Sequence, residues 1–311
     1  MHIFLTGATG YIGNVIAEHL QQAAHSVLGL ARSDSSANRL SGRGIEPFRG
    51  NLRNAASLIR GVQRADAVIH AGFTLDMEAF TPEEFAKAAE AEQDNVRTFI
   101  ETPSGTAKTL IVTSGVGVFG DTGTKVYAED TPFQAPPYLA WRQSVENEVL
   151  NAKSQNVRGM VVRPPVVYGR GGSIIPTVLL QAGRKAGIGL YLGSGENEWS
   201  TVAVDDLAAL YVLALHKGRA GTLFHATAGE PVSIRSIAEA VSRNIGAGGA
   251  TRSWALEEAQ QQLGLVAGGI SANMRASSDV SKWMLGWQPT RSSILDDIAH
   301  GSYAGAPTPF S

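Results

Sequence analysis

The stretch "TGATGYIG", residues 6–13, constrains the fold more than any other part of the chain. Gly7, Gly10 and Gly13 follow an apolar, strand-like run at residues 2–6 and precede a helical pattern of apolar residues. In such a unit the first glycine makes a tight turn, the second lets a diphosphate approach the backbone, and the third lets the helix pack close to the strand. Uncapped N–H groups at the helix start then bind the phosphates. The stretch predicts a dinucleotide-binding βα unit, and the alternative is the same turn without a ligand.

Apolar runs alternate with helical patterns throughout the first half of the chain. One helix is predicted to begin at "TPEE", where Thr81 is the N-cap, Pro82 takes the first helical position and Glu84 closes a capping box. Alternation of strands and helices favours a parallel sheet with helices on both faces. We therefore predict an α/β fold with a Rossmann-type doubly wound sheet. The predicted strands are 2–6, 26–31, 65–71, 109–113 and 157–163.

The pattern changes after residue 163, at the Pro- and Gly-rich "RPPVVYGRGGS". We predict a dinucleotide-binding domain over residues 1–165 and a smaller C-terminal α/β substrate lobe that makes up most of residues 166–311. The apolar helix at 204–217, "VDDLAALYVLAL" and its continuation, should pack back on the sheet. A second helix, "SDVSKWMLGWQP", should end at Gly286.

Composition excludes several classes of function. The net charge of −2 and the pI near 6.4 provide no basic surface for nucleic acid or an anionic membrane. The chain has no cysteine, which excludes disulfides and thiolate chemistry. Its seven histidines are scattered and form no HExxH pattern, so no metal site is expected. A signal peptide and a membrane span are also not apparent, and a cytoplasmic location is expected.

The second predicted strand ends "VLGLARSD" and bears on the choice of coenzyme. An enzyme that prefers NAD usually has an acid at this strand end for the ribose hydroxyls. Here Arg32 and Ser33 occupy the position and Asp34 comes late, so NADP(H) is favoured over NAD(H), because arginine suits a 2′-phosphate. The alternative for Arg32 is a solvated surface side chain. The residues predicted to bind the cofactor are Gly7, Thr9, Gly10, Tyr11, Ile12, Gly13, Arg32, Ser33, Asn51, Leu52, Ala71, Gly72 and Phe73.

Seven short motifs resemble the extended branch of the short-chain dehydrogenase/reductase superfamily, which is NAD-dependent epimerase/dehydratase-like. They are "TGATGYIG", "GNL", "DNVRTF", "VTSGVGVFG", "RPPVVYG", "VDDLA" and "LGWQP", and they span nearly the whole chain. The resemblance implies a nicotinamide cofactor, a small-molecule substrate and a homodimer formed through helices at 82–101 and 137–153. It also implies four further cofactor contacts, at Asn95, Thr113, Pro164 and Val166.

The catalytic set of that superfamily is only partly present. A tyrosine and a lysine four residues later usually share a helix, and a Ser or Thr precedes them at a strand end. Tyr138 matches the tyrosine, Arg142 replaces the lysine, and Ser114 lies one residue before the usual hydroxyl position, which is Gly115. The chain thus resembles an atypical subgroup with an altered YxxxK motif. In the alternative interpretation, Tyr138 marks a helix start and Arg142 forms an exposed helical pair with Glu146.

These observations leave three functions open. The first is NAD(P)H-dependent reduction of a carbonyl on an apolar small molecule, with Phe119, Tyr168 and Trp199 as candidate walls unless they are core residues. The second is epimerisation or dehydration with a tightly held cofactor, although Pro165 replaces an asparagine that the resemblance associates with nucleotide sugars. The third is a sensor that binds the dinucleotide without chemistry.

Overall fold

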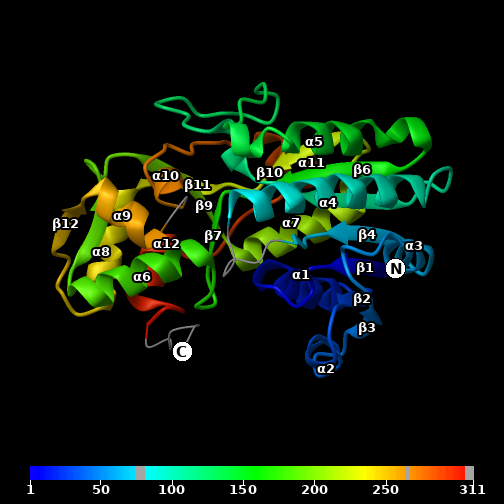
Figure 1. Ribbon diagram of the computed structural model, residues 1–311, viewed down its shortest axis with the longest axis horizontal. Coiled ribbons are helices and arrows are strands. Elements are labelled where there is room, and N and C mark those ends of the chain that lie inside the picture. Colours follow the sequence, from blue (N-terminus) through cyan, green and yellow to red (C-terminus); the bar gives the residue numbers. More distant parts are fainter. Residues whose placement is uncertain (75–80, 264–265, 305–311) are drawn as a thin grey trace.

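The computed structural model describes residues 1–74, 81–263 and 266–304. Its main sheet has seven strands in the order β10-β6-β5-β4-β1-β2-β3, and every pairing in it is parallel. The predicted Rossmann-type α/β fold is confirmed (Figure 1). The strands of this sheet are β1 His2–Thr6, β2 Ser26–Ala31, β3 Glu46–Arg49, β4 Ala67–His70, β5 Thr109–Thr113, β6 Arg158–Arg163 and β10 Thr222–His225.

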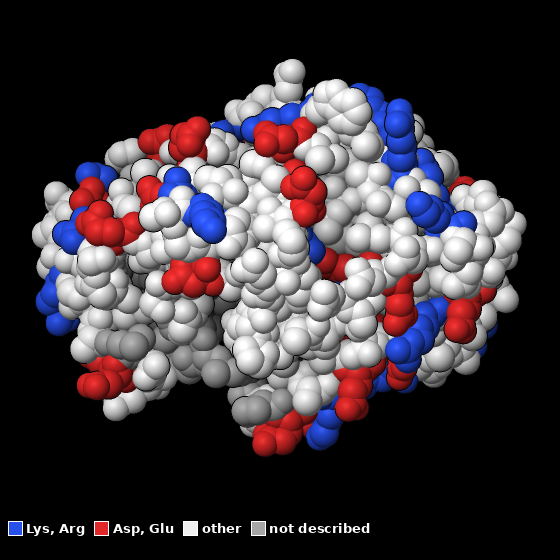
Figure 2. All heavy atoms as spheres, turned by 90° about the horizontal axis from the view of Figure 1, so that it is seen from above, with Lys and Arg blue, Asp and Glu red and all other residues white. Residues whose placement is uncertain are grey.

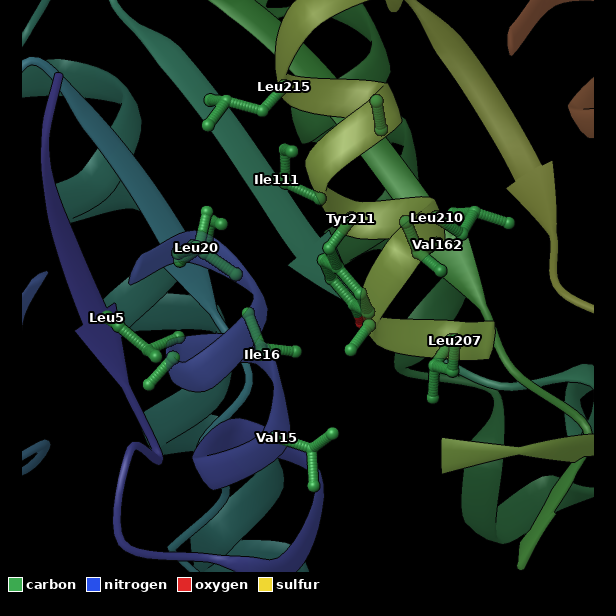
Figure 3. Close-up of a cluster of buried hydrophobic side chains, with 14 of the residues drawn as sticks. Leu5, Val15, Ile16, Leu20, Ile111, Val162, Leu207, Leu210, Tyr211 and Leu215 are labelled. Carbon is green, nitrogen blue, oxygen red and sulfur yellow. The ribbon is translucent and has the colours of Figure 1, made fainter. Parts of the chain in front are cut away.

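Helices cover both faces of this sheet because its strands alternate apolar side chains between the faces. Leu5 and Val162 face one cluster with α1 and α7, whereas Phe4 and Val161 face the other with α3, α4 and α5. Figure 3 shows the first cluster, in which side chains from α1 and α7 meet over the strands. The helices and 3-10 turns around the sheet are α1 Tyr11–Gln22, α2 Asp34–Ser41, α3 Ala55–Gln63, α4 Pro82–Glu101, η1 Val116–Phe119, η2 Pro137–Leu139, α5 Arg142–Asn151, η3 Ala152–Gln155, α7 Val204–Lys217 and α11 Asp279–Leu285.

The second half of the chain builds a smaller layered unit beside the carboxyl ends of the main strands (Figure 1). It contains a three-stranded sheet, β11-β9-β7, and a two-stranded sheet, β12-β8, around a core of their own. Its elements are β7 Val166–Tyr168, α6 Ile174–Ala186, β8 Gly189–Leu192, β9 Glu198–Ala203, β11 Ala228–Ser233, α8 Ile234–Asn244, β12 Thr251–Trp254, α9 Leu256–Leu263, α10 Val266–Ile270 and α12 Ile294–His300.

Several local predictions agree with the structure. Thr81 caps α4, since its hydroxyl accepts a hydrogen bond from the Glu84 backbone N–H at 3.2 Å. Helix α11 ends at Gly286, which is left-handed with φ 66°. Helix α7 packs on α1, β10 joins the main sheet, and α11 packs against β10. More of the second half thus returns to the first than 204–217 alone, and the domain boundary at residue 165 stays a prediction.

The outer face formed by α4 and α5 is charged. Figure 2, which views the molecule from above, shows acidic and basic groups interspersed. Two ion pairs are Lys87 with Glu84 at 2.7 Å and Arg97 with Glu148 at 3.5 Å. In the described ranges no helix is long and apolar enough to cross a membrane. Homodimerisation through this face stays a prediction.

Candidate dinucleotide and substrate site

The opening turn is built so that only glycine fits it. Gly7 is left-handed, with φ 74°, and a Cβ there would clash with the carbonyl oxygen of Ala71 at the end of β4. A Cβ at Gly13 would clash with the carbonyl oxygen of Gly7. Gly10 caps α1 without a side chain, so no side-chain oxygen occupies the first N–H groups of the helix. The turn therefore presents free N–H donors at the positive end of a helix dipole.

A cavity of about 580 Å³ opens beside this turn at the carboxyl ends of β1, β2 and β4. Three arginines, Arg32, Arg39 and Arg53, stand on its rim, and all three are solvent-exposed. Such a cluster of cations suits a phosphorylated ligand. The lining residues are Gly7, Thr9, Gly10, Leu30, Arg32, Ser36, Arg39, Gly50, Asn51, Leu52, Arg53, Ala71, Gly72, Phe73 and Thr74.

A second cavity of about 680 Å³ adjoins the first, and the two share Gly10 and Ala71 in their walls. Its lining contains no charged side chain among the described residues, and its side walls are mainly aliphatic or proline. Such a wall suits an apolar ligand. The lining residues are Gly10, Tyr11, Ile12, Gly13, Ala71, Val116, Gly117, Pro164, Pro165, Val166, Val167, Gly172, Ser173, Ile174, Ile175, Thr177 and Met274.

Most of the predicted cofactor residues line these two cavities, but three lie elsewhere. Ser33 caps α2 instead, because its hydroxyl accepts from the Ser36 backbone N–H at 3.1 Å. Thr113 Oγ1 lies 2.6 Å from the Tyr211 hydroxyl on α7, which occupies its polar atom. Asn95 is buried in α4, and its Nδ2 has no hydrogen-bond partner in the described part of the chain.

Asp34, the acidic residue that follows the end of the second strand, does not line the first cavity. Asp34 forms an ion pair with Arg49 at 3.2 Å. The strand end therefore presents Arg32 to the cavity without a neighbouring carboxylate among the cavity's described lining residues.

The predicted catalytic residues lie apart. Tyr138 is 54% exposed in the 3-10 turn η2, and it does not line either described cavity. The α-helix begins only at Arg142, whose guanidinium carbon lies 4.5 Å from the Trp141 ring centroid and 5.7 Å from that of Phe73. The cation thus packs on aromatic rings, and Tyr138 belongs to a separate 3-10 turn, whose carbonyl at Tyr138 accepts a hydrogen bond from the Trp141 indole N–H at 3.0 Å. Ser114 Oγ is buried at the end of β5, with no hydrogen-bond partner among described residues.

Burial alters the electrostatics of this region. Burial lowers the pKa of the Arg142 guanidinium, and the carboxylates of Glu92 and Glu146 oppose that effect. Glu146 does not form the exposed pair considered above, since it is buried and its carboxylate accepts two hydrogen bonds from the Arg163 guanidinium, one of 2.9 Å at Nε. This pair ties α5 to the end of β6.

The three aromatic residues predicted as substrate walls lie in the core instead. Phe119 packs against the Arg163 guanidinium at 5.0 Å and the His225 ring at 5.5 Å. Tyr168 donates its hydroxyl to the Ser292 carbonyl at 2.6 Å, and Trp199 donates its indole N–H to the Ala272 carbonyl at 3.0 Å. All three rings therefore fill a core, and the polar atoms of Tyr168 and Trp199 bond to backbone.

The wall residues that the sequence did not reveal come from distant segments. Arg39 and Arg53 follow the second and third strands by several residues, and Ile174, Ile175 and Met274 lie in the second half of the chain. The positions of Arg39 and Arg53 after two neighbouring strands could have indicated that they lie near Arg32, because the carboxyl ends of neighbouring parallel strands meet at one edge of the sheet. No sequence signal marked Met274. The described residues contain no group of three or more side chains that could hold a metal ion.

The fold and the glycine turn define a dinucleotide-binding α/β protein of the Rossmann type. The sequence profile of the NAD dependent epimerase/dehydratase family matches residues 3–226, and the chain belongs to that family. The relatives in this family include oxidoreductases that act with a nicotinamide dinucleotide.

Three relatives illustrate the likeness. The chain is 34% identical to the uncharacterized protein C2A9.02 of Schizosaccharomyces pombe, covering 97% of this chain and 100% of that protein. It is 26% identical to a 2-alkyl-3-oxoalkanoate reductase of Stenotrophomonas maltophilia, over 79% and 76% of the two chains. The UDP-glucose 4-epimerase of Thermotoga maritima shares the fold, with a TM-score of 0.80, 19% identity and coverage of 97% and 98%.

Proposed function

We propose that this protein is an NADP(H)-dependent reductase of a carbonyl group on an apolar small molecule. The observation that carries the proposal is the pairing of two adjoining cavities, one rimmed by arginines and one walled by apolar side chains. The cofactor would occupy the first cavity and extend past Gly10 into the second, where the substrate would meet it.

The residues present fit such a cofactor. The uncapped N–H groups of α1 would hold the diphosphate, and Gly7 and Gly13 allow the tight turn that presents them, since a Cβ at either position would collide with backbone. Arg32 and Arg39 would hold a 2′-phosphate, for which the planar guanidinium is suited. When bound, the reduced nicotinamide supplies the hydride. The residues of the protein would bind the substrate, orient its carbonyl and supply the proton.

The apolar cavity supports a substrate with aliphatic groups near its carbonyl. Ile174, Ile175, Val166 and Met274 offer hydrophobic contact, and the absence of charge in the described lining disfavours a nucleotide sugar. The name of the 26% identical relative, a 2-alkyl-3-oxoalkanoate reductase, supports the same chemical class. An alkyl-substituted 3-oxo acid or ester is thus the first substrate to test.

Proton supply is assigned to Tyr138, with Ser114 as the group that orients the carbonyl oxygen and Arg142 as the cation at the ribose. The unpartnered hydroxyl of Ser114 supports its role, because a buried polar atom without a partner is uncommon unless a ligand or water satisfies it. Tyr138 is exposed and its ring stacks edge-on against Phe85, with 6.2 Å between centroids. Proton donation would therefore require that its hydroxyl move toward the second cavity on substrate binding.

The test is to incubate the protein with NADPH or NADH and a series of 2-alkyl-3-oxo esters, and to follow coenzyme absorbance. We expect net consumption of NADPH and a fall in kcat of at least about a hundredfold in Tyr138→Phe, the size typical of a lost acid–base group. Gln143→Ala, a change at an exposed position in the first turn of the following helix α5, is the matched control. Equal rates in wild type and Tyr138→Phe would remove Tyr138 from the mechanism. Product formation without net NADPH consumption would favour epimerisation or dehydration.

A second candidate is a dinucleotide-binding sensor without turnover. It is favoured by Tyr138, which lies outside both described cavities, and by Gly115 at the usual hydroxyl position. Tight NADPH binding with no consumption across the whole carbonyl series would support it over the reductase.

A further inference from the structure

A buried chain of hydrogen bonds runs beneath the first cavity. Gly72 N–H donates to Thr6 Oγ1 at 3.2 Å, Thr6 Oγ1 lies 2.6 Å from His70 Nδ1, and His70 Nε2 lies 3.0 Å from Glu92 Oε2. The three side chains are essentially inaccessible, with 0%, 1% and 3% exposure for Thr6, His70 and Glu92. They come from β1, β4 and α4, so these hydrogen bonds join two neighbouring strands of the main sheet to a helix.

Donors and acceptors match along this series of hydrogen bonds when His70 Nε2 carries a proton for the Glu92 carboxylate and Thr6 Oγ1 pairs with both the Gly72 N–H and His70 Nδ1. Thr6 Oγ1 accepts from Gly72 N–H, and its own proton is then available for His70 Nδ1. His70 Nε2–H in turn donates to the Glu92 carboxylate. In a dry interior such a polarised chain is strengthened cooperatively, and an unpartnered member would be costly.

Both ends of this series of hydrogen bonds lie near the proposed cofactor site. Gly72 and Phe73 line the first cavity, and Thr6 holds the peptide N–H of Gly72 directly. At the other end, the Glu92 charge acts on Arg142, whose guanidinium lies 5.7 Å from the Phe73 ring centroid. Thr6 and His70 thus link the Gly72–Phe73 wall to Glu92 through hydrogen bonds, and Arg142 packs on the Phe73 ring of the same wall.

The arrangement resembles a nucleophile, histidine and acid set, but it cannot act as one. Thr6 has 0% exposure, so no substrate reaches its hydroxyl. A role in fixing other groups fits the geometry better.

We propose that Thr6, His70 and Glu92 are positioning residues, which together fix the Gly72–Phe73 wall and seat the Arg142 cation upon it. This inference rests on the proposed function insofar as that wall faces a nicotinamide dinucleotide. It adds three residues, none of which contacts the cofactor, to those that determine how well it binds.

The test measures the NADPH dissociation constant by fluorescence titration in four variants. Thr6→Val leaves the Gly72 N–H without an acceptor, and Glu92→Gln keeps an acceptor for His70 but removes the charge near Arg142. We expect each to weaken NADPH binding about tenfold, the effect of one buried hydrogen bond. Thr6→Ser should restore binding to within about twofold, because it keeps the hydroxyl. Glu90→Gln, exposed on the same helix, should leave binding unchanged.

A spectroscopic readout separates positioning from general stability. In ¹⁵N-labelled wild-type protein, His70 Nε2 should carry a proton that is hydrogen-bonded to Glu92, both with and without NADPH. An Nε2 without a proton, or wild-type binding in both Thr6→Val and Glu92→Gln, would overturn the proposal. Should these two variants fail to fold, the state of His70 Nε2 and a comparison of Thr6→Ser with wild type still decide it.

The outcomes also separate this proposal from the reductase proposal. NADPH binding without carbonyl turnover would contradict the reductase proposal alone. Turnover by the wild type, together with unchanged NADPH binding in Thr6→Val and Glu92→Gln, would contradict the positioning role alone. A wild-type protein that binds no NADPH would overturn both.

Discussion

The arginine rim of the first cavity permits a quantitative prediction about the coenzyme. Arg32 and Arg39 both line the cavity and both are exposed, so each would act on the proposed 2′-phosphate through a water-like dielectric. Two unit charges about 4 Å apart in water attract by about 1 kcal/mol. A phosphate monoester carries about 1.5 to 2 negative charges, so each arginine is expected to contribute about 1.5 to 2 kcal/mol to the binding of NADPH.

That free energy corresponds to an increase of roughly 10- to 30-fold in the NADPH dissociation constant for Arg32→Ala or Arg39→Ala. The NADH dissociation constant should change little, because NADH has no 2′-phosphate. Fluorescence titration with each coenzyme at low and at 0.5 M salt gives the ratio directly, and the effect should shrink at high salt because exposed charges are screened.

Arg43→Ala is the matched control, since Arg43 is exposed just beyond α2 and does not line either described cavity. An unchanged NADPH constant in the Arg32→Ala, Arg39→Ala double variant would refute the reasoning. An equal loss of NADH affinity would also refute it, because the arginines would then act on a part of the coenzyme that both forms share.

Three further predictions concern stability and the glycine turn. Glu146→Ala leaves the Arg163 charge buried without its carboxylate and should lower the free energy of unfolding by about 3 to 5 kcal/mol, measured by urea denaturation; a loss below about 1 kcal/mol would contradict the buried pairing. Burial, aided by the Arg163 charge, lowers the pKa of His225 to about 3, whereas an unfolded histidine takes up its proton near pH 6.5. The stability contributed by neutral, buried His225 should therefore be fully present above about pH 6.5 and decrease steadily toward pH 3. In urea denaturation, His225→Asn should make the midpoint depend less on pH over this range. Gly13→Ala drives a methyl group into the Gly7 carbonyl, so we expect loss of NADPH binding in calorimetry, and retained binding would show that the turn adapts.

Local features of the chain were accurately predicted because they depend on neighbouring residues. The three glycines, the Thr81 cap and the Gly286 end each require a particular backbone conformation within a few residues. The strand predicted at residues 65–71 was too long, because β4 spans only Ala67–His70. Ala71 lies beyond the strand and packs against the turn at Gly7.

The helix at Tyr138 shows where a local pattern misleads. The spacing of Tyr138 and Arg142 suggested one helical turn, but a 3-10 turn precedes α5, and Arg142 packs on Trp141 and Phe73. The aromatic wall candidates failed for a related reason. A sequence shows that a ring is large and apolar, but it does not show which core the ring will fill.

The sequence by itself determined the alternation of strands and helices in the first half of the chain, the glycine turn and the arginine at the second strand end. These follow from periodicity and from backbone sterics over a few residues. Tertiary structure alone decided that Thr6 meets His70, 64 residues away, and that Met274 closes a cavity that begins at Gly10. The reason is physical: contacts between distant segments depend on the packing of both faces of the sheet, and no short stretch of the chain encodes that packing.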